Sequence, residues 1–304
     1  MPAGAMQPLC EHSAVLHRGA HDLSRRLRSG LRRASDEGAA VLLCLDGAAE
    51  ARIRADFGSM CEQFTFQPAD DRYATPGMAM AALNNFVDTA QQSGATGAWS
   101  IGAIPLRADG RDARWLRYEE AVDEVFFDRP LRALCLYDAE TTPAHLRDEV
   151  RRTHQSLDGD WTDSSHDNRK VVDVLESIPI RCSDRLIRNP SPAAARAALK
   201  SLVGERVSEA VMLDMQLVAS ELVTNAAIHG ATPTWIEMWH EADGLALRVT
   251  DSGLGGVGRH EHLRPARGRA EGGFGLTAVG KLADSVEITR HHDITVVSVY
   301  MALR

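Results

Sequence analysis

The sequence predicts an α/β protein with two domains, an N-terminal domain built on a mostly parallel sheet and a C-terminal α+β two-layer sandwich. Strand-like and helix-like segments alternate over the first half, which is typical of parallel strands joined by crossover helices. In the second half, helical segments are segregated from strands that alternate with period 2. The length of 304 residues also favours two domains.

The composition is that of an ordinary soluble globular protein, with 44% apolar and 25% charged residues. The net charge is −8 and no Lys/Arg block stands out, so no nucleic-acid role is indicated. We expect no signal peptide, because no basic region followed by an apolar stretch opens the sequence, and no run of 18 consecutive apolar residues is present. The five cysteines include no C-x-x-C pair. We therefore expect a cytoplasmic protein without direct membrane or nucleic-acid contact.

In the first half, hydrophobic patterns define each element in turn. Val41–Leu45 is fully apolar, as expected for a strand buried on both faces of a sheet. His21–Ala34 places leucines at every fourth position opposite arginines, which indicates an amphipathic helix. The other expected strands are Ser13–Leu16, Trp99–Ile104 and Leu131–Tyr137, and the other expected helices are Ala48–Phe57, Pro76–Ser93, Ala113–Phe127 and Ala144–Leu157.

No catalytic motif is evident in this half. The turn Leu45–Glu50 lacks the Gly-x-x-x-x-Gly-Lys-Ser/Thr pattern, so we expect no P-loop. Cys10, His12, His17 and His21 are metal-ligand types close in sequence, but their spacing does not match a zinc signature. We interpret His12 as a hydrogen-bonding residue at a strand start, and His17 and His21 as surface residues.

A polar, turn-rich stretch begins at Asp158 and separates the two halves. The domain boundary is expected between Asp158 and Pro179. The predicted organisation is a first domain over residues 1–157, a linker over 158–179 and a second domain over 180–304.

The long helix expected over Val207–Gly230 carries the most informative polar residues. Glu221, Asn225 and His229 are four residues apart and share one helix face, beside an apolar stripe. An Asn amide oxygen can bind a metal, and a Glu one turn away can act on a water or hydroxyl. The alternative is an ordinary solvated face. The other expected elements are helices Ala193–Leu202 and Leu276–Leu282 and strands Thr234–His240, Leu245–Thr250, Val286–Thr289 and Ile294–Ala302.

Two glycine-rich turns follow this helix. Asp251-Ser-Gly-Leu-Gly-Gly256 ends a strand, and Gly272-Gly-Phe-Gly-Leu276 opens a helix. The three segments, in this order, resemble the boxes of the GHKL ATPases, and most closely those of the anti-sigma-factor serine kinases. The likeness covers roughly Ile187 to Arg304 and implies a GHKL (Bergerat) sandwich that binds ATP and Mg²⁺.

The resemblance also implies a role for each site residue. Glu221 would be catalytic and would orient or deprotonate the attacking hydroxyl, Asn225 would hold Mg²⁺, and Asp251 would accept from the adenine amino group. The segment between Gly256 and Gly272 would be an ATP lid carrying Arg259, Arg264, Arg267 and Arg269. The predicted nucleotide-binding residues are Asn225, His229, Asp251, Gly253, Gly255, Gly273, Gly275, Leu276 and Thr295.

The first half, roughly Glu11–Leu157, resembles the MEDS sensory domain of methanogen and methylotroph regulators. The features that carry this resemblance are His12-Ser-Ala-Val-Leu16, Gly38-Ala-Ala-Val-Leu-Leu43, Trp99-Ser-Ile-Gly102, Leu116-Arg-Tyr-Glu-Glu120 and Leu134-Cys-Leu-Tyr137. The resemblance implies a signal-sensing module with a RecA-like, mostly parallel sheet that has lost nucleotide chemistry.

Together, the resemblances imply a serine/threonine kinase that regulates transcription. It would bind a sigma factor, phosphorylate an anti-sigma-factor antagonist protein, form a homodimer and respond to a small molecule at its N-terminal domain. One alternative is a nucleotide-gated binding switch without catalysis. Another is a sensor histidine kinase fragment with His154 as phospho-acceptor, but Gln155 stands where such proteins usually have an acidic residue. We interpret His154 as a surface histidine.

Overall fold

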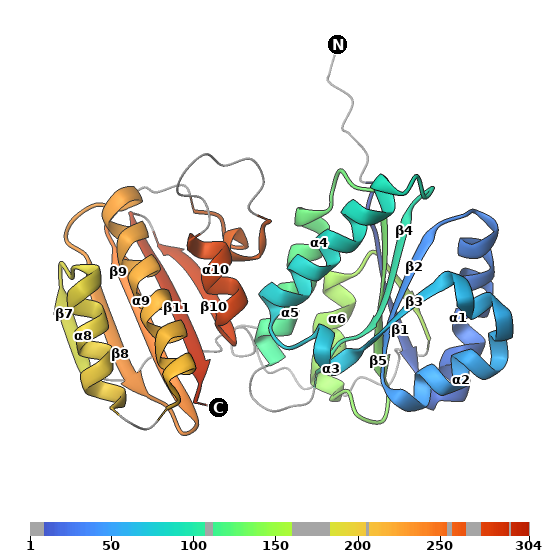
Figure 1. Ribbon diagram of the computed structural model, residues 1–304, viewed down its shortest axis with the longest axis horizontal. Coiled ribbons are helices and arrows are strands. Elements are labelled where there is room, and N and C mark those ends of the chain that lie inside the picture. The colour runs from blue at the N-terminus through green and yellow to red at the C-terminus, as the bar shows by residue number, and fades with distance from the viewer. Residues whose placement is uncertain are drawn as a thin grey trace, which may run out of the picture. The chain divides into compact units, whose positions relative to one another are not determined.

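The computed structural model describes residues 9–106, 112–159, 183–204, 207–253, 257–265, 275–291 and 293–303. These residues form two compact units, one built from β1 to β6 and the other from β7 to β11 (Figure 1). The predicted linker, residues 158–179, lies almost wholly outside the described residues.

The N-terminal unit is built on one sheet with the strand order β3-β2-β4-β5-β1-β6. Every pairing in this sheet is parallel, which confirms the predicted parallel architecture. The edge strand β3 and the short 3₁₀ helix before it, η1 (Gly58–Gln63), were not predicted. The strands are β1 (Glu11–His17), β2 (Ala40–Leu45), β3 (Phe64–Pro68), β4 (Ala98–Ala103), β5 (Leu131–Asp138) and β6 (Ser156–Asp158).

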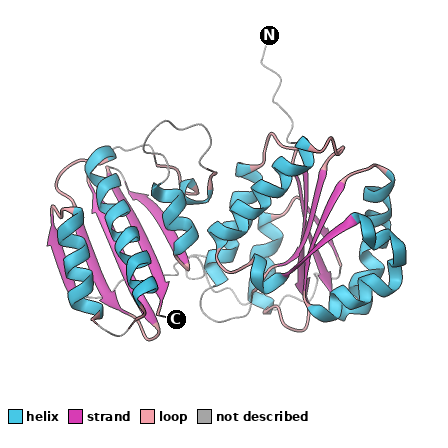
Figure 2. Ribbon diagram, viewed as in Figure 1, coloured by secondary structure: helices cyan, strands magenta, loops and turns pink. Residues whose placement is uncertain are grey.

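Helices cover both faces of this sheet (Figures 1 and 2). On the sheet face covered by α1 and α2, the predicted row of leucines on α1 packs against Leu43 and Ile101 in one buried cluster. Asp46 begins α2 as its N-cap, where its side chain accepts from the Ala49 N–H at 2.8 Å. The helices are α1 (Gly19–Asp36), α2 (Gly47–Phe57), α3 (Ala69–Arg72), α4 (Pro76–Gln92), α5 (Asp112–Val125) and α6 (Ala144–Thr153).

The end of this unit differs from the prediction. The helix expected over Ala144–Leu157 ends at Thr153, because His154 has an extended backbone that leads into β6 beside β1. The expectation that His154 lies on the surface is wrong, since its side chain is buried. His17 is also buried, contrary to its interpretation as a surface residue, whereas His21 is exposed. A local hydrophobic pattern does not predict that elements distant in sequence bury a polar side chain.

The C-terminal unit is a two-layer α+β sandwich, as predicted. Its sheet has the order β10-β11-β9-β8-β7, with every pairing antiparallel. Helices α8, α9 and α10 lie on one face (Figure 1). The strands are β7 (Arg185–Arg188), β8 (Trp235–His240), β9 (Gly244–Asp251), β10 (Ser285–His291) and β11 (Ile294–Ala302), and the helices are α8 (Pro192–Val203), α9 (Glu209–His229), α10 (Gly275–Leu282) and the 3₁₀ helix η2 (Glu261–Leu263).

The edge strand β7 was not predicted. It is short and mostly exposed, so it has no alternating apolar pattern by which it could be recognised.

The central helix α9 is, within the described part of the chain, the single helix long and apolar enough to cross a membrane, with a mean hydropathy of 1.2. Its Ser208 N-cap accepts from the Val211 N–H at 3.3 Å, and the chain leaves the helix at Gly230. One face of α9 lies in the core against the sheet, through Met215, Val218, Ala219, Leu222, Val223 and Ala226.

Candidate functional site

The polar face of α9 lies against the first residue of α10. A methyl group built on Gly275 would stand 2.6 Å from Glu221 Oε2, and 3.1 Å from Asn225 Nδ2. Because glycine has no Cβ atom, the backbone at the start of α10 can approach both side chains more closely than it could with any other residue. The amide nitrogen of Asn225 is buried and has no hydrogen-bond partner among the described residues. The structure thus brings three predicted site residues together.

Asp251 ends β9 and is nearly buried, with 7% of its surface exposed. Burial raises the pKa of its carboxyl group, and a hydrogen bond from the Gly253 N–H to Oδ1, 2.8 Å long, offsets only part of that shift. Thr295 lies opposite Asp251 on β11, and its hydroxyl donates to the Gly253 carbonyl at 3.4 Å. A sheltered carboxylate with one remaining oxygen is suited to accept from an amino group of a ligand.

Gly230 also lies at the candidate site, although the sequence indicated it only as the end of a helix. A methyl group at Gly230 would stand 2.7 Å from the Asp251 carboxyl, and one at Gly253 would stand 2.5 Å from the Cα atom of Gly230. The two glycines therefore allow the end of α9 and the turn after β9 to touch. In the sequence, the feature that could have indicated Gly230 is its place directly after the polar face of the long helix.

A small cavity joins the polar face of α9 to Asp251. Its volume is about 30 Å³, which is close to the space of a single water molecule. An adenine ring therefore requires this cavity to widen. The residues that line it are Leu222, Asn225, His229, Gly230, Asp251, Val257, Leu276, Thr295 and Val297.

The cavity thus includes the predicted residues Asn225, His229, Asp251, Leu276 and Thr295. Its apolar residues Leu222, Val257 and Val297 were not predicted, because in the sequence they are indistinguishable from core residues.

Part of the predicted site lies outside the described residues. This applies to Gly255 and Gly273, and to Arg267 and Arg269 of the expected lid. Of the other lid arginines, Arg264 lies 3.7 Å from Glu261 in an ion pair three residues apart.

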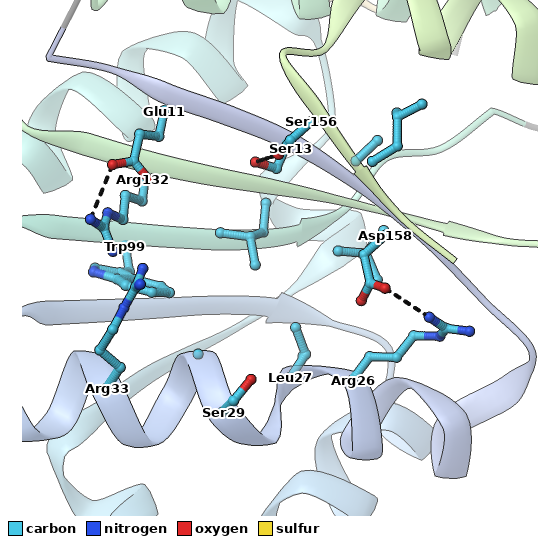
Figure 3. A pocket seen from close by; sticks show the side chains of 15 residues that line it. Glu11, Ser13, Arg26, Leu27, Ser29, Arg33, Trp99, Arg132, Ser156 and Asp158 are labelled. Atoms are coloured by element: carbon cyan, nitrogen blue, oxygen red, sulfur yellow. Dashed lines mark hydrogen bonds and ion pairs between the residues drawn. The ribbon is translucent and has the colours of Figure 1, made fainter. Parts of the chain in front are cut away.

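The N-terminal unit has its own pocket, between α1 and the face of the parallel sheet formed by β4, β5, β1 and β6 (Figure 3). Its volume is about 400 Å³, within the range of small-molecule sites. The ring of Trp99 lies 5.1 Å from the guanidinium carbon of Arg33 and 5.0 Å from that of Arg132. Arg132 also pairs with Glu11 at 3.0 Å.

The guanidinium groups of Arg33 and Arg132 are able to pair with an anionic small molecule, whereas the ring of Trp99 is itself buried. The sequence did not predict this pocket, although Trp99 belongs to a stretch that carries the MEDS resemblance.

Comparisons with known proteins match each unit separately. Residues 11–155 match the family model of MEDS, the methanogen/methylotroph, DcmR sensory domain. Residues 190–301 match the model of the histidine kinase-like ATPase domain. Among solved structures, the NMR structure of the histidine kinase domain of the E. coli osmosensor EnvZ is similar, with 14% identity, 42% of this chain and 93% of that chain covered, and a TM-score of 0.26. No match was found among curated proteins.

Proposed function

Because the chain consists of a MEDS domain followed by a histidine kinase-like ATPase domain, we propose that it is an ATP-dependent serine/threonine protein kinase that regulates a sigma factor. In this proposal, the C-terminal domain binds the sigma factor and phosphorylates an antagonist protein. The N-terminal domain adjusts that activity in response to a small molecule. The single observation that carries the proposal is that Glu221 and Asn225 lie against Gly275 at the start of α10, while Asn225 lines one cavity together with Asp251 and Leu276.

The described residues fit an adenine nucleotide in their chemistry. The amide nitrogen of Asn225 is buried without a hydrogen-bond partner among the described residues, and a phosphate oxygen would satisfy it. Gly275 allows the backbone at the start of α10 to approach Glu221 and Asn225 at a distance that the Cβ atom of any other residue would prevent. When bound, ATP with Mg²⁺ supplies the transferable phosphoryl group and the charge that neutralises it.

Each side chain has a defined task in this site. Asp251 accepts a hydrogen bond from the base, and Asn225 contributes its amide oxygen to the metal. Glu221, one helical turn before Asn225, orients the attacking hydroxyl and accepts its proton. Thr295 supports the turn that carries Gly253 and so holds the base end of the site in shape.

Histidine phosphorylation within this chain finds no support at His154. Its side chain is buried and its Nε2 atom lies 3.1 Å from Glu119 Oε2, so it is not accessible to a phosphoryl donor. This favours a protein hydroxyl on a partner as the acceptor. The partner's identity as a sigma-factor antagonist rests on the family resemblance.

The proposal is tested by incubating the full chain and a candidate antagonist with ATP labelled at the γ-phosphate. The expected result is acid-stable label on a serine or threonine of the antagonist. Glu221→Ala should lower transfer by about 100-fold or more and leave ATP binding nearly unchanged, because general-base catalysis contributes that much to the rate. Glu209→Ala, an exposed glutamate at the start of the same helix, is the matched control.

Two outcomes would contradict the proposal. Acid-labile label on the chain's own histidines would indicate a histidine kinase. ATP binding without any transfer, together with partner release that persists in Glu221→Ala, would indicate a nucleotide-gated switch.

A further inference from the structure

Four side chains from four separate elements meet inside the N-terminal unit. They are His12 on β1, Glu119 on α5, Cys135 on β5 and His154 directly after α6. Each offers one potential metal-ligating atom, and the four atoms all lie within 4.8 Å of one another. His12 and Glu119 have no exposed surface, and the other two side chains are buried as well.

The distances within this cluster are those of a compact coordination shell. His12 Nε2 lies 2.8 Å from Glu119 Oε2 and 3.3 Å from Cys135 Sγ. His154 Nε2 lies 3.1 Å from the same Glu119 oxygen. In a tetrahedral zinc site, with bonds of about 2.0 Å to nitrogen or oxygen and about 2.3 Å to sulfur, ligand atoms stand roughly 3.3–3.5 Å apart. These three pairs need shifts of at most a few tenths of an ångström to reach that spacing, and the remaining pairs lie within 4.8 Å.

Of the three atoms that face away from the cluster, two are hydrogen-bonded to other groups and the third, Nδ1 of His12, lies near a carboxylate without a hydrogen bond to any described residue. The Nδ1 atom of His154 lies 2.7 Å from the Val150 carbonyl, to which it donates. The second carboxylate oxygen of Glu119 accepts from the Tyr137 hydroxyl at 2.9 Å, and Nδ1 of His12 lies 3.5 Å from Asp123 Oδ1. Outer partners of this kind fix the orientation of metal ligands and leave the inner atom for the ion.

The charges of the cluster suit a divalent cation. In the metal-bound state, two neutral imidazoles, one carboxylate and one thiolate would carry two negative charges, and a dication would make this set of four ligands neutral. Neutrality matters here because an uncompensated charge in a dry interior is very unfavourable. The mixed nitrogen, sulfur and oxygen set is also typical of zinc and its neighbours, whereas Mg²⁺ and Ca²⁺ prefer oxygen ligands alone.

We propose that His12, Glu119, Cys135 and His154 bind a divalent transition-metal ion of the zinc class inside the MEDS domain. The site is separate from the pocket beside Trp99 and from the nucleotide site of the other domain. It does not depend on the proposed kinase function.

The test uses the full chain, stripped of metal with a chelator and then titrated with Co²⁺ in the absence of nucleotide. One equivalent should bind with the visible spectrum of tetrahedral Co²⁺ and a thiolate-to-cobalt charge-transfer band, and Zn²⁺ should displace it. Cys135→Ser should abolish the charge-transfer band. The matched control is Cys44→Ser, at another buried cysteine of the same sheet, and it should keep the full spectrum.

Two further variants guard against a loss of folding. Tyr137→Phe removes only the hydroxyl that holds Glu119, and should weaken Co²⁺ binding by about 10–100-fold while the circular dichroism spectrum is unchanged. Glu119→Gln removes a direct ligand and should weaken binding at least as strongly. A spectrum without the charge-transfer band, or one that survives Cys135→Ser, would overturn the proposal and leave a hydrogen-bonded cluster without metal.

Discussion

Replacing Gly275 with alanine should reduce the rate of ATP turnover while changing the free energy of unfolding of the C-terminal unit very little. The new methyl group would stand 2.6 Å from Glu221 Oε2, whereas ordinary contacts of this kind begin at 3.4 Å. The carboxylate is the far end of a flexible side chain, so we expect it to swing away by about 0.8 Å or more. A displacement of about 1 Å in a positioned group can reduce a rate by about 100-fold, or roughly 2.7 kcal/mol in the barrier.

The free energy of unfolding should change little in this variant. Gly275 begins α10, and alanine at a helical position compatible with its backbone stabilises a protein by about 0.4–1 kcal/mol. That gain should offset the cost of moving Glu221. ATP affinity should fall by about tenfold at most, because the methyl group also stands 3.1 Å from Asn225 Nδ2 whereas Asp251 at the base end of the site is untouched.

The assay compares ATP turnover, ATP affinity by calorimetry and the urea midpoint in wild type, Gly275→Ala and Gly47→Ala. Gly47 is the matched control, since it also begins a helix and its added methyl group would meet no atom within 4 Å. Wild-type turnover in a folded Gly275→Ala protein would refute the role given to Glu221. A loss of more than about 2 kcal/mol in stability would refute the idea that its side chain relieves the clash.

Three other substitutions give distinct expectations. Asp251→Asn should weaken ATP binding by about 10–100-fold in calorimetry, because hydrogen bonds to charged groups contribute about 1.5–3 kcal/mol; unchanged affinity would exclude Asp251 from the site. Burial opposes ionisation of Asp22, but hydrogen bonds from Arg26, the Arg18 N–H and Arg25 outweigh it and hold the pKa of Asp22 at about 2. Since the folded pKa lies below the unfolded value near 4, Asp22→Asn should lower the urea midpoint at pH 6 and lose that effect as the pH approaches 2; a constant difference across this range would contradict it. Leu247→Ala, at a fully buried position of β9, should cost about 2–5 kcal/mol in urea unfolding, and a cost below 1 kcal/mol would show that the core refills the space.

The sequence located most elements because their patterns are local. The spacing of the leucines in α1, and the alternation of apolar and polar residues in β8 and β9, each indicate within a few residues which side of the element faces the core. The segments with little pattern of their own were missed. β7 is mostly exposed, and β6 has three exposed residues that are strand only through pairing with β1.

The two candidate sites differ in the same way. The polar residues of α9 and the glycine turn after β9 are short motifs, so a resemblance could name them before the fold was known. The buried cluster has no such motif. His12, Glu119 and Cys135 each stood within a stretch that carried the MEDS resemblance, yet their spacing over more than a hundred residues gave no indication of a common centre.

By itself, then, the sequence predicted the architecture of each domain and most of its elements, and it named candidate residues for the glycine-box site. Only the tertiary structure decided that Gly230 touches the turn after Asp251, that an arginine-flanked pocket surrounds Trp99, and that His154 turns inward to meet His12 and Glu119. The physical reason is the distance along the sequence over which each effect acts. Backbone propensity and hydrophobic periodicity act over a few residues, whereas burial of a polar side chain is set by whichever distant elements pack over it.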